Sequence, residues 1–288
     1  MSGFQQRTVD SGNRAIPYGD QIGEFARESP FDTLDSLIQL ALRSLERYEE
    51  TGSLNDITSA ISLHEKTLVL MTEDHPGRIA ILNNFSQALR IRAQRFTAIE
   101  DLNRAIESGE QAIRLTRSDD SEATVTVLEN LGDALSNRFD WTGSLNDLNR
   151  VIDVMEQAVS LSSKENPKYS IRLINLSDGL NSRFERTGCE DDIDRALLTS
   201  EKAIESMPSG YAERAKVLNI FGNILETLFE STGSLNDLDR AIGVKRQAKS
   251  LTPSNDPAYP GVLNNLGNAL TRRFQMTSSL DDLNQAIT

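Results

Sequence analysis

The sequence contains few of the residues that most often carry chemistry. Its 288 residues include one cysteine, two histidines and one tryptophan. The single cysteine, Cys189, excludes an internal disulfide framework and is typical of a reducing compartment. The first 20 residues lack the apolar core of a secretory signal, so we expect a cytoplasmic protein. With 8 Pro and 17 Gly, the composition is not that of a disordered or fibrous chain.

Long apolar runs and an excess of positive charge are also missing. No apolar stretch approaches the roughly 20 residues that cross a bilayer, so we expect no membrane span. Asp and Glu number 43 against 30 Lys and Arg, which gives a formal net charge of −13. Phosphate backbones and anionic lipids are bound through Lys and Arg, so we expect neither nucleic acid nor a membrane as a partner.

A repeated motif dominates the sequence. The hexapeptide TGSLND occurs at residues 51–56, 142–147 and 232–237, with looser copies at 187–192 and 277–282. Its final acid recurs with steps of 45, 46, 45, 45 and 45 residues, at Asp56, Asp101, Asp147, Asp192, Asp237 and Asp282. The leucines with the same steps are Leu37, Leu82, Leu128, Leu173, Leu218 and Leu263. A fixed period of this length is typical of a repeat array.

Each repeat is predicted to form two amphipathic helices. Leu218, Phe221 and Leu225 follow the spacing i, i+3, i+7 of one helix face. A second apolar stripe follows the hexapeptide, as in Leu238 and Ala241. Since no segment alternates with period two over a useful length, the predicted fold class is all-α.

The hexapeptide is predicted to join the two helices. Its Gly suits a left-handed turn that ends the first helix. The serines predicted to cap the second helix are Ser53, Ser144, Ser234 and Ser279. Each has an Asp three residues later, which forms a capping box favoured by the helix dipole. A calcium loop is the alternative, but even the acids between Glu190 and Asp194 lack the required ligand spacing, so we expect no metal.

Two further positional patterns predict local packing. One site in the first helix is always small: Ala41, Ser86, Gly132, Ser177, Gly222 and Gly267. A mid-helix Gly costs ~1 kcal/mol relative to Ala, so we expect a neighbouring helix backbone to approach closely there. Pro76, Pro167 and Pro257 are predicted to lie in the first turn of first helices, with Asn166 and Asp256 as N-caps.

The pattern L-x-x-[LF]-[GAS]-x-x-[LI] in the first helix, with A-x6-A in the second, resembles the tetratricopeptide repeat (TPR). HEAT repeats have a similar length, but the L-x-x-L-G core favours TPR. The strings LNNLGNALTRRF and TGSLNDLDRAI resemble the extended repeats of fungal proteins. EDHPGRIAILNNF at 73–85 is similar to kinesin light-chain repeats.

This resemblance implies a TPR-like α-solenoid, a right-handed superhelix of helix-turn-helix repeats. It covers about six repeats at residues 31–288, after a flexible arm at residues 1–30 that contains a short helix near residues 21–28. The last repeat is cut short, so we expect a fragment of a longer chain.

The resemblance also implies a binding face. In TPR arrays the first helices line a concave face that binds peptides or protein segments, and in kinesin light-chain-like repeats asparagines there contact the ligand backbone. The matching positions are Asn83, Asn84, Gln87, Asn130, Asp133, Asn175, Asp178, Asn219, Asn223, Asn264, Asn265 and Asn268. Amides both donate and accept, so this row suits an extended peptide, although it is equally consistent with solvated polar residues. Some TPR proteins bind acidic chaperone tails through a carboxylate clamp, in which Lys and Arg lie beside such asparagines. Those basic residues are not matched in this sequence.

A catalytic site is not expected. His64 varies to Gly109, Met155, Ser200 and Lys245 in other repeats, so we expect an exposed position. A Cys–His pair would join residues more than a hundred positions apart, which a stacked array does not bring together. No phosphate-binding loop, nucleophile elbow or Cys/His zinc pattern occurs, so we expect no enzyme and no cofactor.

Three functional hypotheses remain. The leading one is a protein–protein interaction scaffold that binds a peptide or a partner domain. The second, implied by the fungal resemblance, is a sensor or regulatory arm of a larger protein, with a caspase-like (CHAT) protease domain after the array or a nucleotide-binding switch domain before it. The third is self-association through apolar array ends.

Overall fold

The structure is a computed structural model that describes residues 34–116, 121–207, 210–211 and 213–287. All regular secondary structure in these ranges is α-helical, which confirms the predicted all-α class. The described residues divide into two compact units, residues 34–162 and residues 163–287, which we call the N-terminal and C-terminal units. The predicted arm at 1–30 and its short helix lie outside the described residues.

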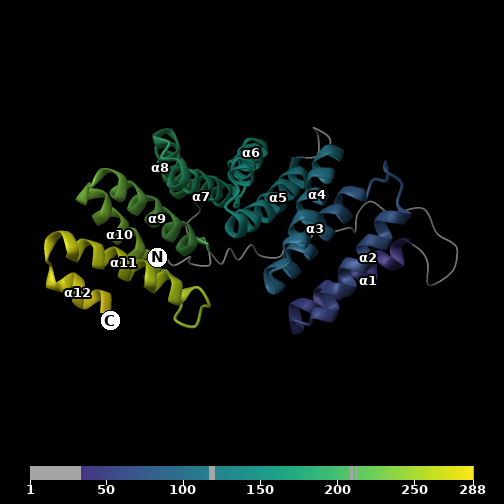
Figure 1. Cartoon of the computed structure of the whole chain (residues 1–288), viewed down its shortest axis with the longest axis horizontal. Helices are drawn as coiled ribbons and strands as arrows, with labels where there is room; N and C mark the ends of the chain where they lie inside the picture. The colour runs from purple at the N-terminus through teal and green to yellow at the C-terminus, as the bar shows by residue number, and fades with distance from the viewer. Residues whose placement is uncertain (1–33, 117–120, 208–209, 212, 288) are drawn as a thin grey trace. The chain divides into compact units, whose positions relative to one another are not determined.

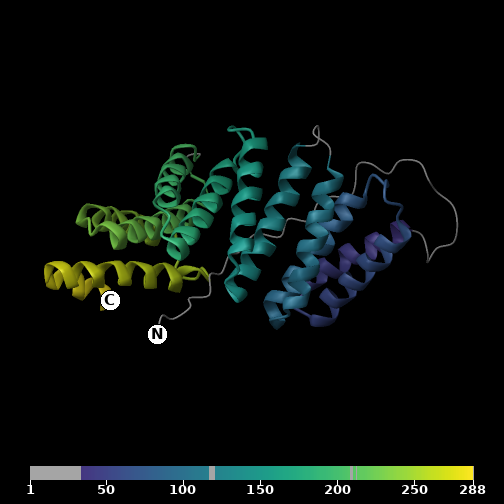
Figure 2. The same ribbon diagram turned by 45° about the horizontal axis from the view of Figure 1, so that its top comes forward.

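The N-terminal unit contains three helix pairs. Their bounds are α1 (Leu34–Thr51), α2 (Leu54–Leu70), α3 (Arg78–Phe96), α4 (Ile99–Leu115), α5 (Ser121–Thr142) and α6 (Leu145–Leu161). We call the odd-numbered helix of each pair the A helix and the even-numbered one the B helix. Figures 1 and 2 show the two helices of each pair running alongside one another. The A helix α3 also packs against the A helix α5.

The C-terminal unit repeats the arrangement. Its helices are α7 (Tyr169–Thr187), α8 (Glu190–Glu205), α9 (Arg214–Thr232), α10 (Leu235–Leu251), α11 (Tyr259–Thr277) and α12 (Leu280–Ile287). The A helix α9 contacts both α7 and α11. Two helices per repeat were predicted from the sequence, and that prediction is confirmed in both units.

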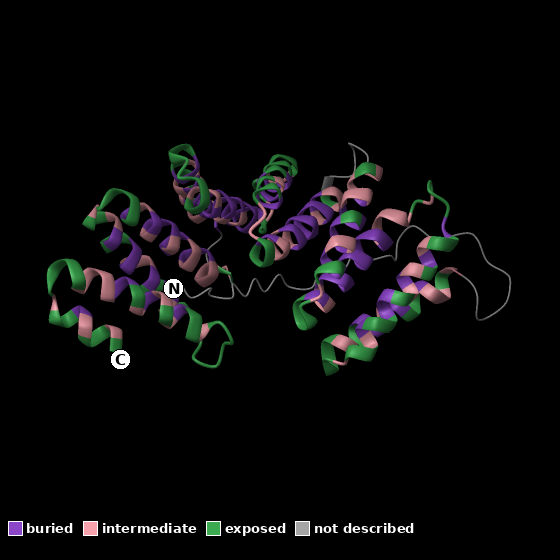
Figure 3. Ribbon diagram, in the orientation of Figure 1, coloured by how far each residue is buried: buried purple, intermediate pink, exposed green. Residues whose placement is uncertain are grey.

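The apolar stripes form the core. In Figure 3 the buried positions lie along the helix faces that meet, and the exposed ones gather at the turns between helices. Leu238 and Ile242 of α10 pack with Phe229 of α9 and with Leu266 and Leu270 of α11. A fully buried Leu or Phe stabilises the fold by roughly 1.5–3 kcal/mol, so these contacts are what hold one repeat against the next.

The turn between A and B helices follows from the hexapeptide. Its glycines adopt the predicted left-handed backbone, with φ of 65° at Gly52 and 72° at Gly233. Its threonine fastens the turn: Thr142 Oγ1 donates to the Arg138 carbonyl at 2.8 Å and accepts from Ser144 N at 3.2 Å. The same two bonds form at Thr51, Thr187, Thr232 and Thr277. Thr and Gly therefore recur because both shape this turn.

The predicted capping box is wrong at two of its four sites. Ser144 Oγ accepts from Asp147 N at 3.3 Å, but α2 and α10 have no side-chain bond from Ser53 or Ser234. The recurrent Asp instead pairs with an Arg nine residues earlier, near the end of the A helix. Arg138 holds Asp147 through two bonds, of 2.9 Å from Nε and 2.5 Å from Nη2.

This Arg–Asp pair recurs in five of the six A–B turns. The other pairs are Arg47–Asp56, Arg92–Asp101, Arg183–Asp192 and Arg273–Asp282. Two of the arginines also reach the preceding B helix: Arg138 Nη1 donates to Asn103, and Arg273 Nη1 donates to Asp239, at 2.9 and 2.7 Å. A bidentate guanidinium–carboxylate pair is among the stronger polar contacts in proteins. The signal was present in the sequence as an Arg at a constant position.

The small residue of the A helix faces a side chain in two repeats, so the predicted backbone approach is wrong there. A Cβ at Gly222 would lie 2.7 Å from Lys245 Cγ, and one at Gly132 would overlap with Met155 Cε. Ser86 fits the prediction, because its Oγ donates to the Ala105 carbonyl at 2.7 Å. Small A-helix residues therefore leave room either for a large B-helix side chain or for the B-helix backbone.

The predicted helix starts are two residues too early. Helices α7 and α11 begin after Pro167 and Pro257, and Asn166 and Asp256 form turns that precede them. Asn166 Oδ1 accepts from Lys168 N at 2.9 Å, and Asp256 Oδ1 accepts from Ala258 N at 2.8 Å. Pro in the second position of a tight turn has the same fixed φ as Pro in a first helical turn, so the sequence did not separate the two.

Candidate functional site

The predicted partner-binding residues lie on A helices. In the N-terminal unit they are Asn83, Asn84 and Gln87 on α3, with Asn130 and Asp133 on α5. In the C-terminal unit they are Asn175 and Asp178 on α7, Asn219 and Asn223 on α9, and Asn264, Asn265 and Asn268 on α11.

In the N-terminal unit most of the row is buried. Asn83, Asn84, Gln87 and Asn130 are almost inaccessible, and Asp133 is half-buried. Asn130 Nδ2 donates to Asn83 Oδ1 at 2.9 Å, which links α5 to α3. This amide pair therefore joins neighbouring repeats.

The C-terminal unit has the same link with a more open row. Asn265 Nδ2 donates to Asn219 Oδ1 at 3.2 Å, joining α11 to α9. Asn264 and Asn268 are exposed, whereas Asn223 is partly exposed, as are Asn175 and Asp178 on α7. Sequence reasoning missed the inter-repeat amide bond, although the signal was Asn at adjacent positions of successive A helices.

A charged cluster lies beside this row in the C-terminal unit. The Lys245 side chain is 0% exposed, and its Nζ donates to Glu226 and, at 3.4 Å, to the Asn265 carbonyl. Burial lowers the pKa of Lys245 to about 7. Arg272 lies 3.9 Å from Glu226 and also pairs with Glu230. The cluster anchors the backbone of α11, which carries the exposed asparagines.

The His64 position is buried, so the prediction of an exposed site there is wrong. His64 is 0% exposed, and neither of its ring nitrogens has a hydrogen-bond partner among the described residues. Burial lowers the pKa of His64 to about 4, so the ring is neutral at physiological pH. The equivalent Met155, Ser200 and Lys245 are also buried, because this B-helix slot faces the A helix of its own repeat. The residue type at this position differs among repeats because several different side chains fit the same space.

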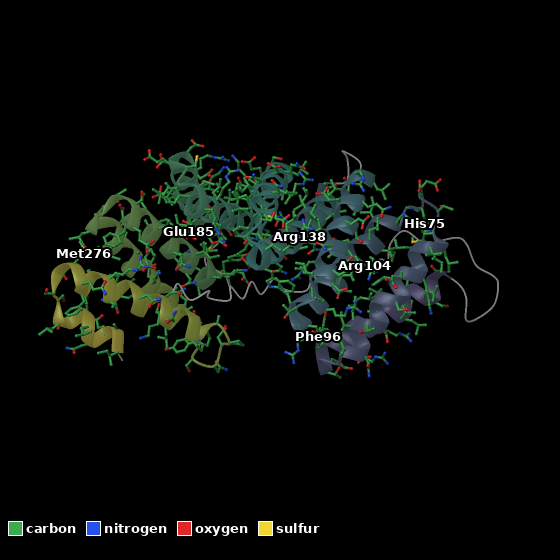
Figure 4. The ribbon with its side chains drawn as sticks, viewed as in Figure 1. His75, Phe96, Arg104, Arg138, Glu185 and Met276 are labelled. Carbon is green, nitrogen blue, oxygen red and sulfur yellow. The ribbon has the colours of Figure 1, made fainter. Side chains whose placement is uncertain are left out.

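Ion pairs link successive B helices. Arg104 of α4 pairs with Glu65 of α2, and Arg150 of α6 pairs with Glu110 of α4. Arg240 and Glu201 form the equivalent pair in the C-terminal unit at 2.8 Å. Figure 4 labels Arg104 and, on α5, Arg138 of the Arg–Asp series. These partly exposed pairs contribute about 0–1 kcal/mol each and mainly favour the correct order of repeats.

One buried arginine, Arg90, does not take part in these ion pairs. Arg90 of α3 is 4% exposed and takes part in no ion pair with the described residues, and its Nε has no acceptor. Its neighbour Arg92, by contrast, is paired with Asp101. Sequence reasoning did not select Arg90.

The described residues show neither a metal-binding cluster nor a membrane span. No group of three or more His, Cys, Asp or Glu in the described ranges is arranged to hold a metal ion. Within the same ranges, every helix is too short or too polar to cross a bilayer. Cys189, the only cysteine, is exposed in the turn before α8.

Neither a family model nor a curated protein sequence matches the chain. Solved structures do match the fold. A putative kinesin light chain from Podosopora anserina with nearly identical TPR-like repeats is 14% identical, with 76% of this chain and 99% of that chain covered, at a TM-score of 0.54. BtubC (BKLC) from P. vanneervenii is 13% identical, with 88% of this chain and 87% of that chain covered, at a TM-score of 0.52.

At these identities the matches establish the fold alone. Together with the helix pairs described above, they show that the chain has the fold of a TPR-like helical repeat protein, an α-solenoid. This confirms the fold class predicted from the sequence.

Proposed function

We propose that the protein is an interaction scaffold that binds a peptide or a partner domain along its A helices. One observation carries the proposal: α9 and α11 present amide side chains at matching positions, with Asn264 and Asn268 exposed and Asn223 partly exposed. Amides donate and accept together, so a row of them suits the backbone of an extended segment.

The amide–amide bond supports this use of the row. Asn265 is bonded to Asn219, and the Asn265 backbone is held by Lys245, so part of the polar row is fixed before any ligand arrives. A preorganised face loses less side-chain entropy on binding, which raises affinity. The bonded asparagines thus act as the framework, and the exposed asparagines act as the contact residues.

Affinity capture with the full chain tests the proposal. Bound proteins are quantified for the wild type and for a variant with Asn219, Asn223, Asn264 and Asn268 all changed to Ala. The matched control changes four exposed asparagines of turns and B-helix starts to Ala: Asn55, Asn146, Asn236 and Asn255.

We expect the row variant to lose most of the captured partner, by roughly tenfold or more, because several backbone hydrogen bonds would be lost together. The control should retain the partner. Equal capture by both variants would remove the A-helix row as the binding face. A wild-type chain that captures nothing specific would remove the scaffold function itself.

A further inference from the structure

One residue of the repeated hexapeptide is not explained by the turn that it helps to form. Threonine and glycine shape the A–B turn and aspartate pairs with an arginine, but the residue that begins each B helix is a half-exposed aliphatic one. In the N-terminal unit these residues are Leu54, Ile99 and Leu145. Apolar side chains left in water at the same place in successive repeats indicate a surface that another molecule covers.

Two aromatic rings lie in the same turns. Phe96 ends α3, and Trp141 is the residue before the last one of α5. Phe96 precedes Ile99 by three residues, and Trp141 precedes Leu145 by four. We call Leu54, Phe96, Ile99, Trp141 and Leu145 the turn edge, and all five are between 38% and 46% exposed. Aromatic residues are enriched where proteins bind one another, and Trp is among the side chains that contribute most.

The three A–B turns follow one another along one side of the N-terminal unit. Figure 2 shows them in succession along its lower side. Helix α3 packs against α5, and Arg138, near the end of α5, donates to Asn103, four residues after Ile99. Packed helices lie about 8–10 Å apart, so three successive turns extend over roughly 20 Å, the length of about 13 helical residues. The turn edge is therefore long enough to contact one side of a short helix.

Negative charge surrounds the turn edge. In residues 46–56, 91–101 and 137–147 there is no lysine, and every arginine except Arg95 is held in an Arg–Asp pair. The acids of these segments outside the pairs are exposed: Glu46, Glu49, Glu50, Glu100 and Asp140. A cationic partner would therefore be attracted to this surface, and an anionic one would be repelled.

We propose that the turn edge is a docking surface for a basic amphipathic helix of a separate protein. The apolar stripe of such a helix would cover the exposed side chains, and its Lys and Arg would contact the surrounding acids. Charge disfavours the two other occupants of an apolar surface: a second copy would bring like acids together, and an anionic membrane would be repelled. The surface consists of helix ends, so it is additional to the amide row of the proposed scaffold function.

Trp141 provides a signal at the site, because it is the only tryptophan of the chain. Its fluorescence is followed in the full chain while acetylated and amidated helical peptides of about 16 residues are added. Both peptides have Leu at the a and d positions of a heptad, and the remaining positions are Lys in one and Glu in the other.

We expect the Lys peptide to shift the Trp141 emission saturably to shorter wavelength, because the ring would leave water. The Glu peptide should bind at least about tenfold more weakly, since its charge has the sign of the surrounding acids. No shift with the Lys peptide, or equal affinity for both peptides, would overturn the proposal.

A pair of variants separates docking from a role in the turn. The edge variant changes the three aliphatic residues of the turn edge to Gln. The matched control changes three exposed residues in turns of the C-terminal unit to Gln: Leu235, Met276 and Leu280. We expect the edge variant to bind the Lys peptide at least about tenfold more weakly and the control to bind it as the wild type does. Equal affinities of all three chains, or an equal loss in both variants, would contradict docking at this edge.

A charge variant leaves every apolar contact in place, so it decides the test if the edge variant loses its helical circular dichroism. It changes Glu49, Glu50 and Glu100 to Gln. At low salt it should bind the Lys peptide several-fold more weakly, and its Tm should stay close to that of the wild type. Unchanged affinity would show that charge does not select the partner and would overturn the proposal.

Two outcomes would assign the turn edge to another occupant and so overturn the proposal. A shift of the Trp141 emission as the chain alone is concentrated would identify a second copy. A shift with vesicles of phosphatidylcholine and phosphatidylserine would identify a membrane. The amide-row variant tests the scaffold function independently, because it should respond to the Lys peptide as the wild type does.

Discussion

At the residue scale, Gly222 and Gly243 show how different two glycines of one repeat are. A Cβ at Gly222 would lie 2.7 Å from Lys245 Cγ, whereas a Cβ at Gly243 would meet nothing within 4 Å. Both lie inside helices, α9 and α10, where Ala is intrinsically favoured by about 1 kcal/mol. A change to Ala is therefore favoured by helix propensity at both glycines, but at Gly222 alone the added Cβ would clash with a neighbouring side chain.

We predict that Gly222→Ala lowers the free energy of unfolding by about 1–3 kcal/mol through overpacking against Lys245. Gly243→Ala, the matched control, should leave it unchanged or raise it by up to about 1 kcal/mol. Urea unfolding followed by circular dichroism measures both. Equal effects of the two substitutions would show that packing at the small site does not limit stability.

His64 gives the fold a pH dependence with a defined sign. Its folded pKa is lowered to about 4 by burial, below the ordinary value of 6.5. The unfolded chain therefore binds the proton more readily, so this contribution to stability is fully present above pH 6.5 and is lost as the pH falls toward 4. Each pH unit in that interval lowers the free energy of unfolding by at most about 1.4 kcal/mol.

We predict that His64→Leu flattens the stability profile between pH 6.5 and 4, because Leu of similar size does not titrate. His75→Asn is the control: His75 Nδ1 accepts from Gly77 N in a turn, and Asn166 serves the same purpose before α7. Unfolding curves at half-unit pH intervals provide the comparison. If His75→Asn flattens the profile and His64→Leu does not, the buried histidine is not the cause.

At the element scale, the Arg–Asp pair is the main polar connection between the A and B helices of a repeat. One repeat lacks it: Leu228 of α9 occupies the position of the arginine, and Asp237 is left with Arg240 at 3.7 Å. This natural exception allows the contribution of the pair to be measured by addition as well as by deletion.

We predict that Leu228→Arg stabilises the protein by about 1 kcal/mol, since a bidentate pair with the largely buried Asp237 carboxylate would form. Leu228→Met is the control for loss of the leucine and should be neutral or slightly destabilising. Thermal unfolding should show a Tm for the Arg variant that is a few degrees above that of the Met variant. A lower Tm for the Arg variant would indicate that Leu228 packs in a way that the other repeats do not share.

At the scale of the whole molecule, charge restricts the class of partner. The chain carries 43 acidic and 30 basic residues. Many of the described arginines, among them Arg92, Arg138, Arg183 and Arg273, are held by carboxylates of the same chain. The charge of these guanidinium groups is already neutralised, and the formal net charge of −13 opposes the approach of a polyanion.

We predict that the full chain does not retard a DNA duplex in gel-shift assays, even at low salt, where counter-ion release favours binding most. A DNA-binding domain with a net positive charge, run in the same gel, is the control that should retard the duplex. Retardation by the unaltered chain would contradict the restriction drawn from net charge.

Particular residues show what was predictable and what was not. The glycine turns were predictable, because a left-handed backbone is a local requirement of the turn itself. The Arg–Asp pair was present at constant spacing but was missed, since capping offered a local explanation for the same acid. The exposure of His64 was predicted wrongly, because variation among repeats resembles variation at a surface.

The sequence by itself determined the all-α class, the period, the helix pairs and the turn chemistry, because each depends on residues close together in the chain. Tertiary structure alone decided which amides bond across repeats and which remain exposed. It also decided that His64 and Lys245 are buried. Those properties arise from side chains on helices that are distant in sequence, and burial and pairing exist only once these helices pack together.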